Sequence, residues 1–256
     1  MHRFFLVLLV IFLFSFTVDA QVLGHLSAGA GAGLDGTSFE LASSLGKHVQ
    51  VRVGYGTAVG LGYTLKGDKG VWVKVHPDQE GSPEVRVPMK FSLARNDARL
   101  LFNLYPSEGS GFHFTLGAYL GSGSFFKSVV KDLPEEYNTV GCDLAGHRVK
   151  AVDNRIRMDL KAFGFGSQNL AVQPYAGIGF GRAVDEDKKV SFSFDLGALY
   201  QGQPSLWARS VDSGGKTGYV DVTRNNVIDL QDVIDKYGKF VYFWPVLNFH
   251  LYFNLL

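Results

Sequence analysis

The nine residues from Leu247 to Leu255, close to the end of this chain, alternate strictly between apolar and polar side chains. A strand separates the two sets onto opposite faces, whereas a helix would scatter both around its circumference. One face of such a strand carries leucines and phenylalanines, and the other carries two asparagines, a histidine and a tyrosine. The segment therefore predicts a strand with one apolar and one polar environment.

Residues 1–20 have the three parts of a secretory signal peptide. Arg3 supplies the positive charge, residues 4–14 are all apolar, and Val18-Asp19-Ala20 fits a cleavage site before Gln21. The apolar run is too short to cross a bilayer as a helix, which needs about 20 residues. We expect a signal peptide over 1–20 and one exported domain over 21–256, without a helical membrane span.

The period-two alternation recurs along the chain and predicts eight strands. Their approximate ranges are 38–41, 49–55, 85–93, 99–104, 112–120, 172–180, 190–198 and 247–255. Export combined with this pattern predicts an all-β fold, an antiparallel transmembrane β-barrel with an apolar face toward lipid and a polar face toward the lumen.

Two features leave ten strands open as the alternative. The connection 57–83 is long for a periplasmic turn, and extending the strand that begins at Val49 through residues 62–65 would shorten it. Asp35-Gly36 could instead turn an additional hairpin.

Glycine is abundant, with 31 of 256 residues. Many glycines fall inside alternating segments, as in Ala28 to Gly33 and Gly177 to Gly181. Glycine weakens the interior of a strand in a soluble sheet. In a small barrel it relieves crowding on the concave lumen side, so the pattern favours a tight barrel.

Charge and cysteine content exclude several classes of function. The chain has 25 basic and 24 acidic residues, so no charge excess indicates nucleic acid as a partner. The single cysteine, Cys142, cannot form a disulfide within the chain.

Several longer motifs resemble a known family. They are Gly33 to Ala42, Leu104-Tyr105-Pro106 followed by Phe112-His113, Gly117-Ala118-Tyr119, Pro174 to Arg182, Phe192 to Gly197, and Tyr237 to Leu247. In these motifs the chain resembles small outer-membrane β-barrel proteins known from Bacteroidetes. The resemblance implies the cell outer membrane as location, with the lipid bilayer and the outer-membrane assembly machinery as partners. It implies no activity, because the family has none assigned.

The predicted lumen face collects a set of charged side chains. They are Glu40, Arg52, Arg86, Lys90, Arg99, His113 and Asp195. Side chains fill the interior of an eight-stranded barrel, and charges buried there must be paired. We expect a structural network in which Glu40 pairs with Arg52, Lys90 or Arg99. A narrow pore lined by the basic excess is the alternative, and a catalytic pair of Glu40 and Asp195 is a third interpretation.

Catalysis has little support in the sequence. Barrel enzymes that modify lipids place a nucleophile and a histidine near the lipid-facing rim. Here His113 and His250 fall on polar faces, and no serine-centred motif accompanies them. We therefore expect no enzymatic activity, and a lipid-modifying barrel enzyme is the second alternative.

One local pattern resembles the calcium loop of dockerin modules. Its oxygen-bearing residues are Asp221, Thr223, Asn225, Asp229 and Asp232. Asn226 stands where the turn glycine is usual, and the segment occurs once. The competing interpretation is a short helix over 226–236, capped by Asn225. We expect the helix and no cofactor, with calcium as the alternative.

The two longest insertions, 122–169 and 201–242, hold most of the chemical variety. Loops on a rigid scaffold commonly carry function. The sequence therefore predicts a non-enzymatic barrel with a structural role or with surface loops that bind an external ligand or protein. A narrow channel for ions or small solutes, which would make the chain porin-like, is the alternative.

Overall fold

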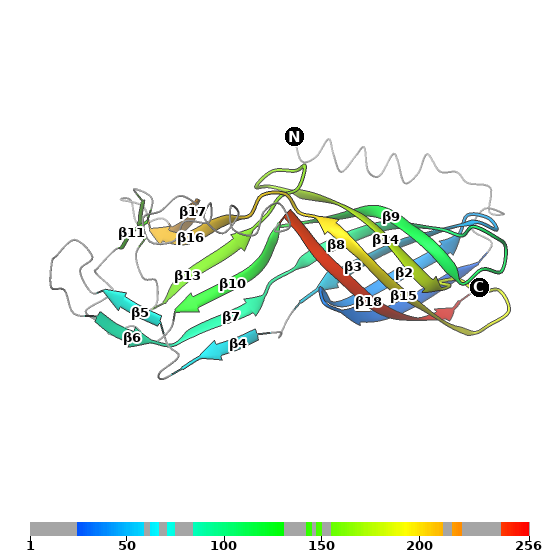
Figure 1. Ribbon diagram of the computed structural model, residues 1–256, viewed down its shortest axis with the longest axis horizontal. Coiled ribbons are helices and arrows are strands. Elements are labelled where there is room, and N and C mark those ends of the chain that lie inside the picture. Colours follow the sequence, from blue (N-terminus) through cyan, green and yellow to red (C-terminus); the bar gives the residue numbers. More distant parts are fainter. Residues whose placement is uncertain are drawn as a thin grey trace.

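The computed structural model describes residues 25–58, 62–66, 71–74, 84–130, 142–144, 147–149, 155–211, 217–221 and 242–255. It has two main parts, a barrel and a second sheet that extends from one end of it (Figure 1). The expected signal peptide and the expected helix over 226–236 lie outside the described residues. Within them, no helix is long and apolar enough to cross a membrane.

Eight antiparallel strands close the barrel. They are β1 (Leu26–Gly33), β2 (Gly36–Ser44), β3 (Val49–Thr57), β8 (Asn96–Leu104), β9 (Phe112–Gly121), β14 (Ala171–Gly181), β15 (Val190–Tyr200) and β18 (Phe243–Asn254). Their order around the wall is β1-β18-β15-β14-β9-β8-β3-β2. The predicted all-β fold and its eight strands are confirmed.

A second, six-stranded sheet has the order β17-β16-β13-β10-β7-β4. Its strands are β4 (Gly62–Leu65), β7 (Met89–Leu93), β10 (Ser124–Val130), β13 (Ile156–Lys161), β16 (Ser205–Val211) and β17 (Thr217–Asp221). We call it the extension sheet. Two further pairs are formed by β5 (Val71–Lys74) with β6 (Glu84–Val87), and by β11 (Cys142–Leu144) with β12 (His147–Val149).

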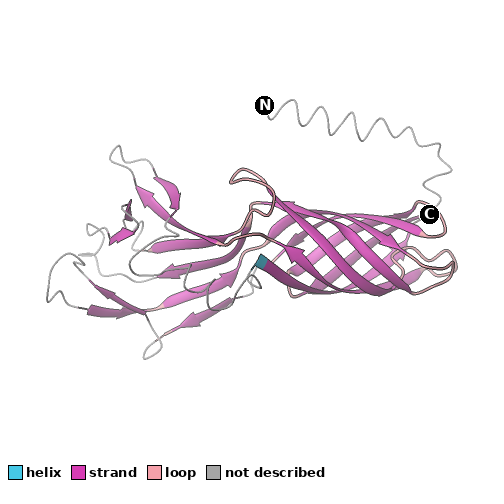
Figure 2. Ribbon diagram, turned by 45° about the horizontal axis from the view of Figure 1, so that its top comes forward, coloured by secondary structure: helices cyan, strands magenta, loops and turns pink. Residues whose placement is uncertain are grey.

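The extension sheet continues six of the barrel strands in the same order. Along the chain β4 follows β3, β7 precedes β8, β10 follows β9, β13 precedes β14, β16 follows β15, and β17 precedes β18. The β1–β2 hairpin instead turns back at Leu34-Asp35. Figure 2 shows the result, a barrel whose wall runs on past one rim as an open sheet. The C-terminus and the turns 45–48, 105–111 and 182–189 lie at the opposite rim.

The strand count was predicted correctly through two errors that cancel. The expected barrel strand 85–93 is wrong, because Pro88 divides it into β6 and β7, which both lie outside the barrel. The first barrel strand, β1, was missed as a strand of its own. Asp35-Gly36 does turn a hairpin, with Gly36 at a φ of 106°. That extra strand moves the long connection 57–83 to the extension rim, so ten strands are not needed.

Burial in the barrel is the reverse of that in a soluble protein. Along β18, outward phenylalanines and leucines alternate with buried polar residues. Phe39 is 69% exposed and Phe253 57%, whereas Arg52 is 2% exposed. Every barrel strand except β1 presents large apolar side chains outward, and β1 presents alanines. The barrel therefore has an apolar belt outside and a polar filling inside.

Glycines on the lumen side of β1 make room for the large polar residues of β18. Gly29 lies opposite Tyr252, and Gly31 lies opposite His250. A Cβ atom added at either glycine would overlap the ring of its partner. The glycine-rich first strand therefore allows bulky polar side chains to fill a narrow barrel.

Gly31→Val should prevent correct closure of the barrel, because the added side chain would overlap His250. Overpacking of this kind costs about 1–3 kcal/mol or more. The matched control is Ala30→Val, which adds bulk to the neighbouring, outward-facing position of the same strand. Refolding yield, followed by the gel mobility shift on boiling, should fall for Gly31→Val alone. Equal yields for both variants would contradict the assigned facing of β1.

Candidate functional site

Arg52 on β3 lies at the centre of the lumen and binds two carboxylates. Its Nε lies 2.8 Å from Glu40 Oε2, and its Nη1 lies 2.9 Å from Asp195 Oδ2. Asp195 is on β15, and three strands separate β3 from β15 in either direction around the wall. The Arg52–Asp195 ion pair therefore joins opposite walls of the barrel.

Two histidines and a tyrosine complete this network. His250 Nε2 lies 3.3 Å from Glu40 Oε1, and His113 Nε2 lies 3.2 Å from Asp195 Oδ1. Tyr252 Oη donates a hydrogen bond of 2.6 Å to Glu40 Oε2. Because the side chains come from β2, β3, β9, β15 and β18, the network ties together strands from all around the wall.

A second charged cluster involves side chains from near the extension rim. Arg99 Nη2 lies 2.8 Å from Asp35 Oδ2, and Arg99 Nε lies 2.9 Å from Asp97 Oδ1. The Arg99 guanidinium stacks on Tyr119, 4.5 Å from the ring centroid. Arg95 donates a 2.6 Å hydrogen bond to Gln173 Oε1. Arg95 Nε also lies 3.6 Å from Asp97 Oδ2, so each of the two arginines has a carboxylate within 4 Å.

Other packing fills more of the lumen. Leu101, Tyr119, Tyr175, Leu199 and Val246 form a buried apolar cluster. At the rim of the short turns, Ala183 and Val184 fold inward against Ala42 and Tyr252. Gln50 Nε2 donates a 2.7 Å hydrogen bond to the Val184 carbonyl and fixes this turn. Ala183 and Val184 therefore fill the lumen at this rim, while residues 186–189 of the turn stay exposed.

The structure brings five of the seven expected lumen residues inside: Glu40, Arg52, Arg99, His113 and Asp195. The lumen positions expected for Arg86 and Lys90 were wrong. Arg86 belongs to β6, and Lys90 is an exposed residue of β7 in the extension sheet.

Sequence reasoning missed Asp35, Arg95, Asp97 and His250 as members of the lumen clusters. Their position on the polar side of the alternation could have identified Asp97 and His250. With them included, three buried arginines face four buried carboxylates, Glu40, Asp35, Asp97 and Asp195. The described lumen therefore has no excess of arginine over carboxylate, which removes the expected basic lining.

Glu40→Ala should destabilise the barrel by about 3–5 kcal/mol, because it leaves the buried Arg52 and His250 without a principal partner. Lys47→Ala is the control, since it breaks the Lys47–Glu108 ion pair, in which the side chains are 71% and 63% exposed. Exposed pairs contribute little to stability. Urea unfolding of the refolded barrel in lipid measures both. Similar losses for the two variants would contradict a buried network.

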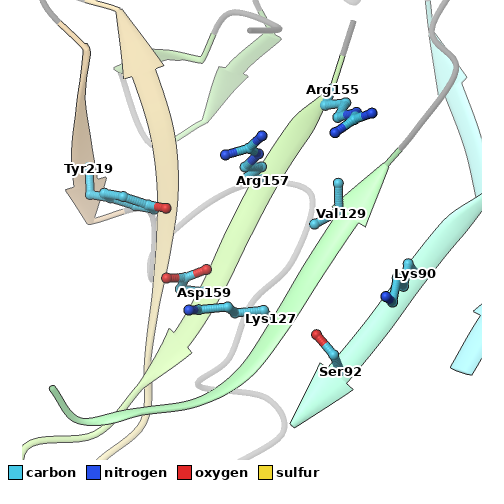
Figure 3. Close-up of a pocket in the computed structure, with 8 residues that line it drawn as sticks. All are labelled: Lys90, Ser92, Lys127, Val129, Arg155, Arg157, Asp159 and Tyr219. Carbon is cyan, nitrogen blue, oxygen red and sulfur yellow. The ribbon is translucent and has the colours of Figure 1, made fainter. Parts of the chain in front are cut away.

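One face of the extension sheet carries a groove lined mainly by lysine and arginine side chains, which we call the basic groove (Figure 3). It encloses about 320 Å³ and is lined by Lys90, Ser92, Lys127, Val129, Arg155, Arg157, Asp159 and Tyr219. Strand register aligns these residues. Lys90, Val129 and Arg157 form one row across β7, β10 and β13, and Ser92, Lys127 and Asp159 form the next.

The groove has four cationic side chains and a single acidic one. Figure 3 shows Lys127 reaching along the sheet toward Asp159. Burial raises the pKa of the Asp159 carboxyl, although Lys127, Lys161 and Arg157 act to lower it. Within the described part of the chain, no ion pair involves Lys90, Arg155 or Arg157. The groove therefore concentrates positive charge that the described residues leave largely uncompensated.

The expected calcium loop is described only at its first position. Asp221 ends β17, while Thr223, Asn225, Asp229 and Asp232 lie outside the described residues. Over the ranges that are described, no cluster of histidine, cysteine and acidic residues could hold a metal ion.

No protein-family model and no curated protein matches the chain. Among solved structures, the chain is similar to Acinetobacter baumannii CarO2, at 19% identity and a TM-score of 0.47, over 90% of this chain and 98% of that one. Acinetobacter baumannii CarO has 14% identity and a TM-score of 0.43, with 89% and 96% covered. A major outer membrane protein from Thermus thermophilus has 13% identity and a TM-score of 0.39, with 90% and 98% covered.

Proposed function

We propose that this protein is an outer-membrane barrel that anchors the extension sheet at the cell surface and works there as a non-enzymatic binding or structural protein. The observation that carries the proposal is the ion pair between Arg52 and Asp195, which crosses the lumen at 2.9 Å. A barrel tied across its centre is suited to hold a surface element rather than to pass solutes.

The exterior of the barrel supports the membrane location. Its strands are 8 to 12 residues long, which matches the 9–11 residues that a tilted strand needs to cross a bilayer. Phenylalanine, leucine, isoleucine and valine side chains surround the wall, and the charged side chains of the same strands point inward. In water this belt would be a large exposed apolar patch, whereas lipid satisfies it.

The unequal rims support the orientation. Barrels of this class have short periplasmic turns and longer external loops. The turns 45–48, 105–111 and 182–189 would then face the periplasm, and the extension sheet would project outward from the cell. The parts of the insertions 122–169 and 201–242 that the structure describes are largely strands of this sheet, rather than the loops expected from sequence.

The positions of Arg86 and Lys90 remove the argument for a channel. It depended on a basic excess of Arg52, Arg86, Lys90 and Arg99 over Glu40 and Asp195, but Arg86 and Lys90 lie outside the lumen. Asp35 and Asp97 add acidic groups inside, and each is within 3 Å of Arg99. No unpaired row of cations remains among the described lumen residues to guide anions.

Cell fractionation tests the location. The protein should appear in the outer-membrane fraction, with a gel mobility that changes on boiling, because the belt is soluble only in lipid or detergent. Protease added to intact cells should cleave in the extension sheet and not in the turns 105–111 or 182–189. Recovery from the soluble periplasm, or cleavage at those turns, would contradict the proposal.

Planar-bilayer recording tests the closed lumen. The refolded protein should show no steady conductance, because Arg52, Glu40 and Asp195 meet at the centre of the barrel. A porin inserted under the same conditions serves as the positive control. Steady anion-selective openings that decrease in Arg52→Ala would overturn the sealed barrel in favour of a channel.

A further inference from the structure

The cationic side chains inside the barrel have more carboxylate partners than those in the basic groove. Arg52 and Arg99 each contact carboxylates at 2.8 to 2.9 Å inside the barrel. In the basic groove, Lys90, Lys127, Arg155 and Arg157 lie together against one carboxylate, that of Asp159. Gathering four cations within one cavity is unfavourable unless an anion joins them, because like charges repel. The groove therefore has the electrostatics of an anion site.

The identity of the cations indicates which anion fits. Arg155 directly precedes β13, and Arg157 is the second residue of that strand. Because they are two residues apart in extended backbone, their side chains share the groove face. Guanidinium groups present a flat fork of donors that matches two oxygens of a phosphate, and lysines add mobile point charges. Figure 3 shows the two arginines on one strand and the two lysines on neighbouring strands, around a common space. Such a set suits a phosphate group better than a single carboxylate.

The remaining lining groups suit hydroxyls. Ser92 offers a hydroxyl, Asp159 offers acceptor oxygens, and Tyr219 offers a partly exposed aromatic ring and a phenol. Sugars are bound by this kind of group, through hydrogen bonds to their hydroxyls and contact with a ring face. A cavity of about 320 Å³ is at the small end of ligand sites, which span roughly 300–1,000 Å³. It would hold one phosphorylated sugar unit.

We propose that the basic groove binds a phosphorylated saccharide, with the phosphate between Lys127 and Arg157, which lie in adjacent rows of the sheet, and the sugar toward Tyr219. This deepens the proposed function and depends on it only in placing the groove outside the cell. The same chemistry has two sources, a free sugar phosphate or the phosphorylated saccharide headgroup of a membrane lipid.

Calorimetric titration of the full-length barrel in detergent tests the ligand class. Glucose 6-phosphate should bind more tightly than inorganic phosphate, glucose should not bind measurably, and the affinity should fall as salt rises. Lys127→Gln and Arg157→Gln should each weaken binding about tenfold or more, because each removes a charged hydrogen-bond donor. Asp159→Asn should tighten the binding of inorganic phosphate, because it removes the one acid in the groove.

Lys189→Gln is the matched control for Lys127→Gln, because Lys189 is an exposed lysine at the opposite rim. It should leave the affinity unchanged. No binding of glucose 6-phosphate at millimolar concentration, or equal losses in Lys127→Gln and Lys189→Gln, would overturn the proposal. Folding of each variant is checked by the mobility shift on boiling, so that loss of binding in a correctly folded, outer-membrane-located protein contradicts this inference and leaves the proposed function intact.

A competition experiment separates the two sources. The barrel is placed in phosphatidylcholine vesicles with or without lipid A, and glucose 6-phosphate is titrated into each. Weaker apparent binding in the vesicles that contain lipid A assigns the groove to a lipid headgroup, and equal binding assigns it to a soluble ligand. Both results support the phosphorylated saccharide, whereas absence of binding in both preparations contradicts it.

Discussion

The ion pairs of Arg52 with Glu40 and Asp195 are the constraint on which the rest of the barrel depends. A charge buried in a narrow lumen must be paired, so each carboxylate has to lie where the arginine can reach it. That requirement fixes strand register, because a slip of one residue would turn Glu40 to the apolar outer face of the barrel. It also requires space, which the glycines of β1 provide opposite His250 and Tyr252. The apolar exterior follows from the same alternation, because each residue next to an inward polar side chain in a strand points outward.

The general fold could be predicted from sequence because a strand with period two leaves little ambiguity once a lumen and a lipid face are assumed. The positions of individual strands were predicted wrongly where the alternation is weak or does not identify the sheet. Residues 26–33 consist mostly of alanine and glycine, which give no large apolar side, so β1 was missed. Residues 85–93 show clear alternation but lie beyond the rim, because alternation reports two different environments and not which sheet a strand joins.

The candidate sites divide in the same way. Glu40, Arg52 and Asp195 could be identified because each lies on the polar side of a strong strand. Asp35 and Arg95 are in connections, where periodicity gives no facing, and Lys90 was assigned to the lumen through the misplaced strand. The basic groove could not be predicted, because Lys127 and Arg157 come to line one groove only through the pairing of β10 with β13, across a long insertion. Local sequence patterns do not show which residues of two distant strands will pair.

A double-mutant cycle between Arg52 and Asp195 measures whether a buried ion pair across the lumen holds the barrel together. Unfolding free energies are measured in lipid for the unaltered protein, Arg52→Gln, Asp195→Asn and the double variant. We expect each single variant to be strongly destabilised and the pair to show a favourable coupling of about 2 kcal/mol or more. A coupling within about 0.5 kcal/mol of zero, with additive single effects, would contradict it.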